Sequence, residues 1–334
     1  MTLHMDLGAR GYDIVVARGC LADAGALLPL RRRVLIVTDD GVPAAYAERV
    51  AAQCAAPLTV TVPQGEESKS LRTLEWLLTA MLDAGFTRSD CVCAVGGGVA
   101  GDLAGFAAAS YMRGVAFYNL PTTLLAQVDS SIGGKTALNL GGVKNIVGAF
   151  WQPGKVLIDP DTLRTLPPRE YACGMAEAVK TALIGDAALF ALFVSGAAMR
   201  APEQVIAASL AVKKAVVEAD EREQGLRKTL NFGHTIGHAI ESVTGLKHGE
   251  CVALGMLPMC APELRAQLLP VLEALGLPTQ VRADPEAVWR ALLHDKKMAD
   301  GRISAVYVQT PGRCELRDVS PETLREGIET VVKA

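Results

Sequence analysis

The chain has 334 residues, a length that suggests two domains or one large one. Hydrophobic residues make up 50% of it and aromatic residues only 5%, a mix that favours helices packed on a parallel sheet. The net charge is −3 and the sequence has no long basic run. A nucleic acid is therefore not expected as the main partner.

The cysteines and the N-terminus indicate a cytoplasmic protein. Eight cysteines are scattered through the sequence, most of them in apolar contexts, which is typical of buried thiols in a reducing cytosol. The N-terminus lacks a charged region followed by a long apolar stretch, so no signal peptide is expected. No apolar run approaches the roughly 18 residues of a membrane span, so no membrane partner is expected either.

Apolar runs rich in β-branched residues alternate with helical patterns up to residue 160. Strands are predicted at 12–17, 34–38, 58–62, 91–95, 115–120 and 155–158, and helices near 43–54, 70–84 and 99–110. This alternation predicts an α/β domain with a Rossmann-like, mostly parallel sheet. Ligands of such sheets bind beyond the carboxyl ends of the strands.

A glycine motif follows the predicted strand 91–95. Gly96, Gly98 and Gly101 match G-x-G-x-x-G, in which the backbone approaches a pyrophosphate at a helix N-terminus. The acidic residue usual about 20 positions later is missing, because 118–121 reads Tyr-Asn-Leu-Pro. Asp39, at the end of a predicted strand, or Glu66, in a turn, could hold the ribose instead. Either acid could equally be a solvated loop or cap residue.

A second glycine-rich segment, residues 132–148, carries possible anion ligands. Its Gly-Gly-Lys-Thr at 133–136 resembles the end of a Walker A loop, but the first glycine of that motif would fall on Asp129. An ATPase is therefore excluded. Lys135, Lys144 and Asn145 crowd the same segment, and two lysines on glycine-supported loops suit a phosphate or carboxylate. Ordinary surface lysines remain the alternative.

Pro167 and Pro168 mark a domain boundary, which predicts an α/β domain at 1–166 and a mainly helical domain at 167–334. Helices are predicted at 168–184, 186–196, 202–223, 229–243, 249–263, 266–275, 285–294 and 321–332. A strand pair is predicted at 303–308 and 314–317.

A polar stripe runs through the second domain at steps of four, four, three, four and three residues. Its members are Glu223, Arg227, Asn231, His234, His238 and Glu241. This is the spacing of one face of an α-helix, and burying such groups unpaired would cost several kcal/mol each. They are therefore expected to meet a metal, a substrate or each other.

Glu177 lies in a helical segment among small apolar residues and is expected to point inward, with Lys180 one turn later on the same face. A Glu with two histidines is an ordinary zinc set that leaves positions open for a substrate. Spacing alone does not choose two of His234, His238 and His248. Lys296 and Lys297 follow Asp295 and could form another anion contact, or simply a solvated loop.

Together these motifs resemble the 3-dehydroquinate synthase family, within the sugar phosphate cyclases, over about residues 39–297. The resemblance rests on the segments 96–102, 111–114, 121–135, 144–145, 167–170, 174–180, 220–223, 230–238 and 248–250. Matches this long and in this order are far more specific than any one motif.

The resemblance implies a metal, zinc or cobalt, on Glu177, His234 and His248, with His238 facing the substrate. NAD binding is implied for Asp39, Glu66, Lys69, Gly97, Gly98, Asp102, Thr122, Thr123, Lys135, Lys144, Thr162, Leu163 and Thr165. Catalytic roles are implied for Asp129, Lys135, Lys180, Lys213, Glu223, Arg227, Asn231 and His238. Further substrate contacts are implied for Arg113, Lys144, Asn145 and one of Lys296 and Lys297. Arg113 matches an arginine that reaches the neighbouring subunit's site, which implies a homodimer.

The implied reaction is carried out by a carbon–oxygen lyase of the shikimate pathway. It cyclises 3-deoxy-D-arabino-heptulosonate 7-phosphate to 3-dehydroquinate, releases phosphate, and uses and regenerates NAD within one turnover. Arg227 would suit the carboxylate of that substrate. One alternative is a sister cyclase such as 2-deoxy-scyllo-inosose synthase or an epi-valiolone synthase. Another is a metal-dependent glycerol or alcohol dehydrogenase, which would release NADH.

Overall fold

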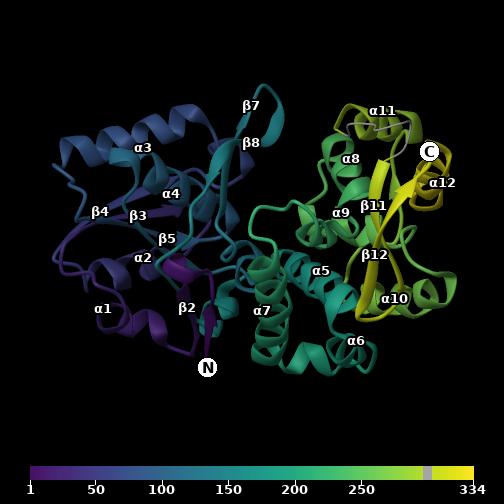
Figure 1. The fold of residues 1–334 in the computed structure, drawn as a ribbon, viewed down its shortest axis with the longest axis horizontal. Coiled ribbons are helices and arrows are strands. Elements are labelled where there is room, and N and C mark those ends of the chain that lie inside the picture. The colour runs from purple at the N-terminus through teal and green to yellow at the C-terminus, as the bar shows by residue number, and fades with distance from the viewer. Residues whose placement is uncertain (296–302) are drawn as a thin grey trace. The chain divides into compact units, whose positions relative to one another are not determined.

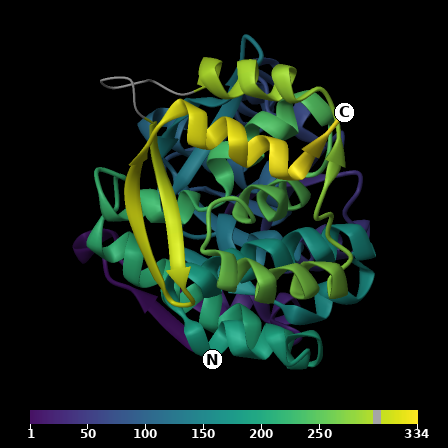
Figure 2. The same cartoon turned by 90° about the vertical axis from the view of Figure 1, so that its right-hand side faces the viewer.

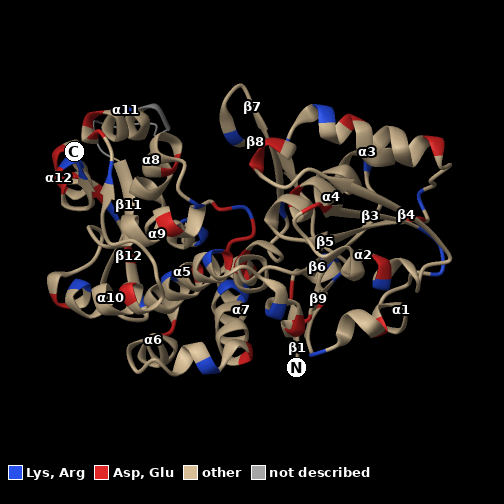
Figure 3. Ribbon diagram, turned by 180° about the vertical axis from the view of Figure 1, so that it is seen from behind, with Lys and Arg blue, Asp and Glu red and all other residues tan. Residues whose placement is uncertain are grey.

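The computed structural model describes residues 1–295 and 303–334. Its contacts divide the chain into two compact units, Met1–Leu166 (unit 1) and Pro167–Ala334 (unit 2). Along the described ribbon, basic and acidic segments are interspersed in both units (Figure 3). None of the helices in the described ranges combines the length and the hydropathy needed to cross a bilayer.

Unit 1 is built on a seven-stranded sheet in the order β1-β2-β9-β6-β5-β3-β4 (Figure 1). The strands are β1 (Thr2–Met5), β2 (Tyr12–Val16), β3 (Arg33–Asp39), β4 (Ala56–Val62), β5 (Cys91–Gly96), β6 (Ala116–Pro121) and β9 (Lys155–Ile158). β1 pairs antiparallel with β2, and the other neighbours pair in parallel. The mostly parallel α/β sheet predicted from the sequence is confirmed.

Both faces of this sheet are buried, as a parallel sheet requires. In β3, Leu35 and Val37 join one apolar cluster, whereas Val34 and Ile36 join another. The first cluster includes residues of α3 (Leu71–Asp83) and α4 (Gly98–Ser110), and the second includes residues of α1 (Ala24–Leu27) and α2 (Ala44–Ala51). The continuous apolar run of β3 is thus explained by helices on both sides (Figure 1).

The glycine-rich segment 132–148, predicted as loops, forms most of a β-hairpin, so that prediction was wrong. β7 (Lys135–Leu140) pairs antiparallel with β8 (Val143–Phe150). The turn consists of Gly141 and Gly142, whose φ values are 60° and 82°. Two positive φ values in a two-residue loop suit the twist of a hairpin, and glycine adopts them without a steric cost.

Unit 2 consists mainly of helices with one long hairpin (Figure 2). The helices are α5 (Pro168–Gly185), α6 (Ala187–Val194), α7 (Pro202–Ala219), α8 (His234–Thr244), α9 (His248–Met256), α10 (Pro262–Ala274), α11 (Pro285–Asp295) and α12 (Pro321–Val331). β11 (Ile303–Thr310) and β12 (Arg313–Val319) form the antiparallel hairpin, and the short strands β10 (Val281–Arg282) and β13 (Val332–Lys333) pair in parallel. The mainly helical character predicted for this half is confirmed.

The polar stripe from Glu223 to Glu241 does not lie on one helix, so that prediction was wrong. After α7, the carboxylate of Asp220 accepts hydrogen bonds from the backbone N–H groups of Gln224, Gly225 and Arg227 and folds the chain into a turn. A 3-10 helix follows at Leu226–Asn231, and α8 starts only after Gly233, whose φ is 77°. Side chains of Asp and backbone-permissive glycine interrupt a helix in this way.

Candidate metal and nucleotide sites

Glycines bring the histidine-bearing helices α8 and α9 into backbone contact. A Cβ added to Gly255 would lie 1.9 Å from the carbonyl oxygen of Gly233, and one added to Gly237 would lie 2.8 Å from that of Cys251. Real Cβ atoms are not found so close to a backbone oxygen, so these positions require glycine. The glycines of the Asn-Phe-Gly-His-Thr-Ile-Gly-His motif therefore set the spacing between His234 and His248.

Helix α9 is fastened to α5 in a similar way. A Cβ on Gly249 would lie 2.4 Å from the carbonyl oxygen of Cys173, so the first turn of α9 touches the backbone of α5. Arg169 donates from Nε and Nη2 to both oxygens of Glu250, at 2.6 and 2.7 Å. This bidentate pair joins the N-terminal turns of the two helices. It thereby directs His248 toward Glu177, which lies two turns further along α5.

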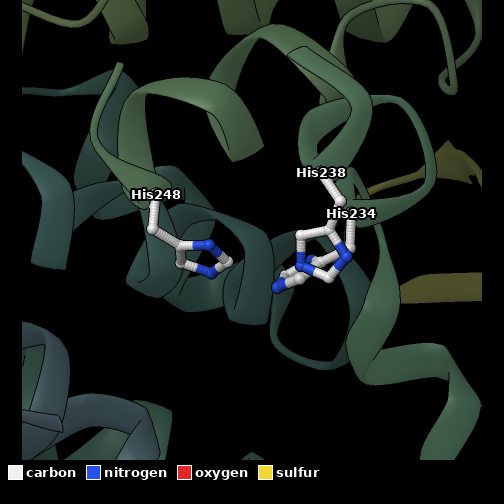
Figure 4. A group of neighbouring side chains, drawn as sticks. All are labelled: His234, His238 and His248. Carbon is white, nitrogen blue, oxygen red and sulfur yellow. The ribbon is translucent and has the colours of Figure 1, made fainter. Parts of the chain in front are cut away.

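Glu177 is the centre of a buried polar cluster. The residue is only 1% exposed, and its Oε1 lies 3.1 Å from Nε2 of His248 and 3.7 Å from Nε2 of His234. Nζ of Lys180 lies 2.7 Å from Oε2. Ligand atoms of His234, His238 and His248 lie within 4.8 Å of one another, and Figure 4 shows the three imidazole rings pointing toward one another.

The two rings beside Glu177 are held so that Nε2 faces the carboxylate. Nδ1 of His234 lies 2.9 Å from the carbonyl oxygen of Phe232, and Nδ1 of His248 lies 3.1 Å from Oε2 of Glu241. Since these oxygens only accept, both rings donate from Nδ1. Histidines that ligate metals through Nε2 are held in this manner.

The charges of the cluster suit a divalent cation. Burial opposes the ionisation of Glu177, but Lys180 and the two imidazoles hold its pKa well below the ordinary value. Burial lowers the pKa of His234 to about 3, which keeps that ring neutral. For His248, burial acts in the same direction, but the carboxylates of Glu177 and Glu241 outweigh it and raise the pKa to about 10, so this ring carries a proton that a bound cation would displace. Neither oxygen of Glu177 has a hydrogen bond of ordinary geometry despite the close neighbours, and a buried carboxylate of this kind calls for a further partner. One carboxylate and two imidazoles match a zinc donor set.

The other polar residues of unit 2 that were predicted as site residues differ in their solvent exposure. Arg227 and Lys213 are 1% and 8% exposed, whereas His238 is exposed. Asn231 Nδ2 donates to Oε1 of Glu223 at 3.0 Å, which joins two members of the predicted stripe although they share no helix. The predicted contacts Lys296 and Lys297 lie outside the described residues.

Unit 1 gathers its predicted nucleotide ligands at the carboxyl ends of adjacent parallel strands. Asp39 ends β3, Gly97 and Gly98 follow β5, and Thr122 and Thr123 follow β6. The backbone N–H of Thr122 donates to the carbonyl oxygen of Gly96, which ties the second of these turns to the third. The strand–glycine–helix arrangement predicted from the motif is present, and a Cβ at Gly97 would lie 3.1 Å from Cγ2 of Thr123.

Buried Lys69 connects this edge to the β7–β8 hairpin. Its Nζ lies 2.7 Å from Oδ2 of Asp102 and 3.2 Å from Oε1 of Glu66, and it also donates to the side-chain oxygen of Asn145. Burial raises the pKa of Asp102 to about 6, although Lys69 acts in the opposite direction. The structure therefore joins three predicted nucleotide ligands to one predicted substrate ligand.

Asn139 and Gln127 complete these networks and were not identified from the sequence. Asn139 donates from Nδ2 to Oε1 of Glu66 at 3.0 Å and accepts from the backbone N–H of Asn145 at 2.9 Å. Gln127 donates from Nε2 to the carbonyl oxygen of Pro121 and to Oγ1 of Thr162. Gln127 lies in the motif segment 121–135 and Asn139 in the glycine-rich segment 132–148, but their polar character was the only sequence signal of either role.

The remaining predicted residues lie on turns and on the hairpin. Thr162, Leu163 and Thr165 occupy the 3-10 helix Pro160–Thr165 after β9, and Asp129 lies in the π-helical segment Ala126–Ser130. Lys135 and Lys144 are exposed on β7 and β8. Arg113 is exposed with a φ of 68°.

A carboxylate–imidazole cluster and a glycine turn after a parallel strand are typical of enzymes that combine a metal with a nucleotide. A family model described as 3-dehydroquinate synthase N-terminal matches residues 59–173, and one described as 3-dehydroquinate synthase C-terminal matches residues 174–298. The chain belongs to the 3-dehydroquinate synthase family.

Curated relatives match nearly the whole chain. The 3-dehydroquinate synthase of Symbiobacterium thermophilum is 45% identical and that of Paracoccus denitrificans 42% identical. These alignments cover 98% and 97% of this chain, and 99% and 97% of the two relatives.

Solved structures of other sugar phosphate cyclases are similar throughout. A 2-deoxy-scyllo-inosose synthase complexed with carbaglucose-6-phosphate, NAD⁺ and Co²⁺ has a TM-score of 0.87 at 26% identity, covering 98% of this chain and 99% of that one. A 2-epi-5-epi-valiolone synthase from Streptomyces hygroscopicus with NAD⁺ and Zn²⁺ also has a TM-score of 0.87, at 29% identity and 96% coverage of both chains. A probable glycerol dehydrogenase from Sinorhizobium meliloti shares the fold, with a TM-score of 0.65 at 18% identity, covering 95% of each chain.

Proposed function

We propose that this chain cyclises 3-deoxy-D-arabino-heptulosonate 7-phosphate to 3-dehydroquinate with loss of phosphate, in the cytoplasm, as a step of the shikimate pathway. The observation that carries the proposal is the buried cluster of Glu177, His234 and His248, found in a chain 45% identical to a 3-dehydroquinate synthase. The two sister cyclases with solved structures are less similar, at 26% and 29% identity, and the dehydrogenase shares only the fold.

The proposal assigns a divalent cation, zinc or cobalt, to Glu177, His234 and His248 in unit 2, and NAD to unit 1. When bound, the cation polarises a substrate hydroxyl, and NAD accepts and later returns a hydride. The solved sister cyclases were obtained with NAD⁺ and with Co²⁺ or Zn²⁺, which supports both assignments. The nucleotide ligands are assigned to Asp39, Glu66, Lys69, Gly97, Gly98, Asp102, Thr122, Thr123, Thr162, Leu163 and Thr165. Lys135 and Lys144, for which the resemblance also implies NAD binding, are assigned to the substrate phosphate instead.

The chain's own residues hold the substrate and its charges. Lys180 is 2.7 Å from Glu177 and keeps that carboxylate ionised in a buried place. The guanidinium of Arg227 is a fixed fork for the substrate's carboxylate, since arginine binds carboxylates through two parallel hydrogen bonds. Its burial matters, because a charge contact shielded from water is stronger than an exposed one.

Further polar residues are assigned to the sugar hydroxyls and the phosphate. Asp129, Lys213, Glu223, Asn231 and His238 would orient the hydroxyls by hydrogen bonds. Lys135, Lys144 and Asn145 would hold the phosphate, and its oxygen takes the proton from the neighbouring carbon as the phosphate leaves. Arg113 is assigned to the substrate site of a neighbouring subunit.

Phosphate release without net NADH distinguishes this function from the alternatives. With the heptulosonate phosphate and catalytic NAD, we expect steady phosphate release, no accumulation of NADH absorbance, and little release when NAD is omitted. Phosphate release from a hexose 6-phosphate, but not from the heptulosonate, would indicate a sister cyclase. Steady NADH formation with glycerol would indicate a dehydrogenase. Either result would contradict the proposal.

Removal of the metal is expected to abolish turnover. Prolonged treatment with a strong chelator, followed by its removal, should lower phosphate release to the background, because the buried carboxylate–imidazole set loses the cation that polarises the substrate. Added Zn²⁺ or Co²⁺ should restore it, whereas Mg²⁺ should not, since magnesium prefers oxygen ligands. Full activity in protein shown to be metal-free would refute the assignment.

Replacing Lys135 by alanine is expected to weaken phosphate binding. We expect kcat/KM to fall about a hundredfold through loss of a charged phosphate contact, with NAD affinity changed by less than about twofold. Arg72→Ala removes another exposed cation of unit 1 and should change neither quantity. If NAD affinity collapses while substrate kinetics survive, Lys135 has been placed wrongly.

An apolar groove near Arg113 supports a homodimer. It has a volume of about 360 Å³ and is lined mainly by apolar side chains, together with two polar ones: Leu71, Leu74, Leu78, Leu82 and Tyr111, with Glu75 and Thr79. Leu82 is 68% exposed, and Met112, beside Arg113, is 44% exposed. Because an exposed apolar surface of this kind favours association, and because Arg113 is assigned to a neighbouring site, we propose a second copy of the chain as its occupant.

The charge-introducing variant Leu82→Glu tests the dimer. We expect a dimer for the unmodified chain and a monomer for the variant in sedimentation velocity, because a buried unpaired carboxylate opposes association. Arg88→Glu, an exposed change on the same unit, should leave the dimer intact. A monomeric unmodified chain, or a dimer unaffected by Leu82→Glu, would contradict the proposal.

A further inference from the structure

Glu241 holds one of the two histidines beside Glu177 and has no role in the function described above. It lies in the last turns of α8, seven residues after His234, and its Oε2 is 3.1 Å from Nδ1 of His248 on α9. Its side chain is only 13% exposed. The pair therefore links the two histidine-bearing helices through a largely buried, charge-assisted hydrogen bond.

The two histidines are supported by different groups. The ring of His234 is held by the carbonyl oxygen of Phe232, which belongs to the turn just before α8. His248 is the first residue of α9, and its Nδ1 contact comes from a side chain of another helix. His248 is also the more exposed of the two rings, at 33% against 12%. Its orientation therefore depends on Glu241.

We propose that Glu241 is a positioning residue that fixes the ring of His248 for metal binding. The inference rests on the cation assignment under the proposed function. By accepting the Nδ1 proton, the carboxylate leaves Nε2, which lies 3.1 Å from Oε1 of Glu177, as the nitrogen that binds the cation, and it raises the electron density of the ring. The negative charge also suits the N-terminus of α9, where the helix dipole places a partial positive charge.

Two substitutions separate the hydrogen bond of Glu241 from its negative charge. Glu241→Gln keeps an accepting oxygen at the same distance but removes the charge, whereas Glu241→Ala removes both. If Glu241 acts on the metal through His248, cation affinity should fall in the order Glu, Gln, Ala. A residue that merely packs the helix would instead change stability, with glutamine close to glutamate.

The test is metal affinity in the full chain, measured by competition of Zn²⁺ with a chromophoric chelator. We expect Glu241→Ala to bind Zn²⁺ about 10- to 100-fold more weakly and Glu241→Gln to lie between it and the unmodified chain. With Co²⁺, the visible absorption bands of the alanine variant should shift in position or intensity, because the geometry at His248 changes. Glu326→Gln and Glu326→Ala, at an exposed position of α12, are the matched controls and should change nothing.

Stability of the metal-free proteins separates positioning from packing. The thermal unfolding midpoints of the metal-free variants should stay close to that of the unmodified chain. The proposal is overturned if Zn²⁺ affinity and the Co²⁺ spectrum are unchanged in Glu241→Ala, or if glutamine binds as tightly as glutamate. It is also overturned if the loss of affinity only follows a loss of metal-free stability. If the unmodified chain binds no Zn²⁺ or Co²⁺, the proposed function itself fails, and this inference with it.

Discussion

Glu177→Gln is expected to abolish tight metal binding and to lower turnover at least a thousandfold. The carboxylate is 1% exposed and faces Nε2 of both His234 and His248, so it supplies the only negative charge that directly contacts these two nitrogens in the described site. A neutral amide of the same shape supplies none. Metal content after dialysis, phosphate release and unfolding free energy should be measured together.

The same variant should also destabilise the fold, which calls for a paired control. Lys180 is 1% exposed and lies 2.7 Å from Glu177, and a buried charge that loses its partner costs about 3–5 kcal/mol. Glu177→Gln combined with Lys180→Met removes both charges and should recover much of the stability without recovering the metal. A stable double variant that still binds one equivalent of Zn²⁺ and turns over normally would contradict the assignment.

Gly255→Ala is expected to cost about 3 kcal/mol of unfolding free energy or more. Its Cβ would lie 1.9 Å from the carbonyl oxygen of Gly233, so α8 and α9 must move apart. Because His234 and His248 lie on these two helices, metal affinity should fall with stability. Denaturant unfolding and Zn²⁺ competition measure the two effects.

Gly101→Ala in α4 is the matched control for helix propensity. The nearest atom to its Cβ, Nδ2 of Asn119, would lie at 3.4 Å, an ordinary contact. Alanine there should leave unfolding free energy unchanged or raise it by up to about 1 kcal/mol. If Gly255→Ala behaves in the same way, backbone contact does not set the spacing of the histidines.

Sequence patterns predicted unit 1 well where the signal was local. Its central strands are continuous apolar, β-branched runs, and each lies within a few residues of its predicted position because both faces of the sheet are covered. The β7–β8 hairpin was missed because glycines and lysines in 132–148 gave no clear alternation of polar and apolar residues. Its turn depends on the positive φ values of Gly141 and Gly142, which a periodicity does not report.

The polar stripe identified residues of the site although the single helix predicted to carry them was wrong. A helical period over 223–241 gathered several groups that lie in the site region, yet a turn built on Asp220 and the positive φ of Gly233 breaks the helix. Contacts that support the site, such as Glu241 with His248 or Asn139 with Glu66, join separate elements and have no signature in spacing. Spacing also left open which two of the three histidines bind the metal, and only the family resemblance suggested the pair His234 and His248.

Anomalous scattering from crystals of the Zn²⁺-loaded protein, recorded on both sides of the zinc absorption edge, tests the assignment most directly. We expect one strong peak in unit 2, about 2.0–2.2 Å from an oxygen of Glu177 and from Nε2 of His234 and His248. A peak bound by His234, His238 and His248 without Glu177, or no peak at this cluster in active protein, would contradict it.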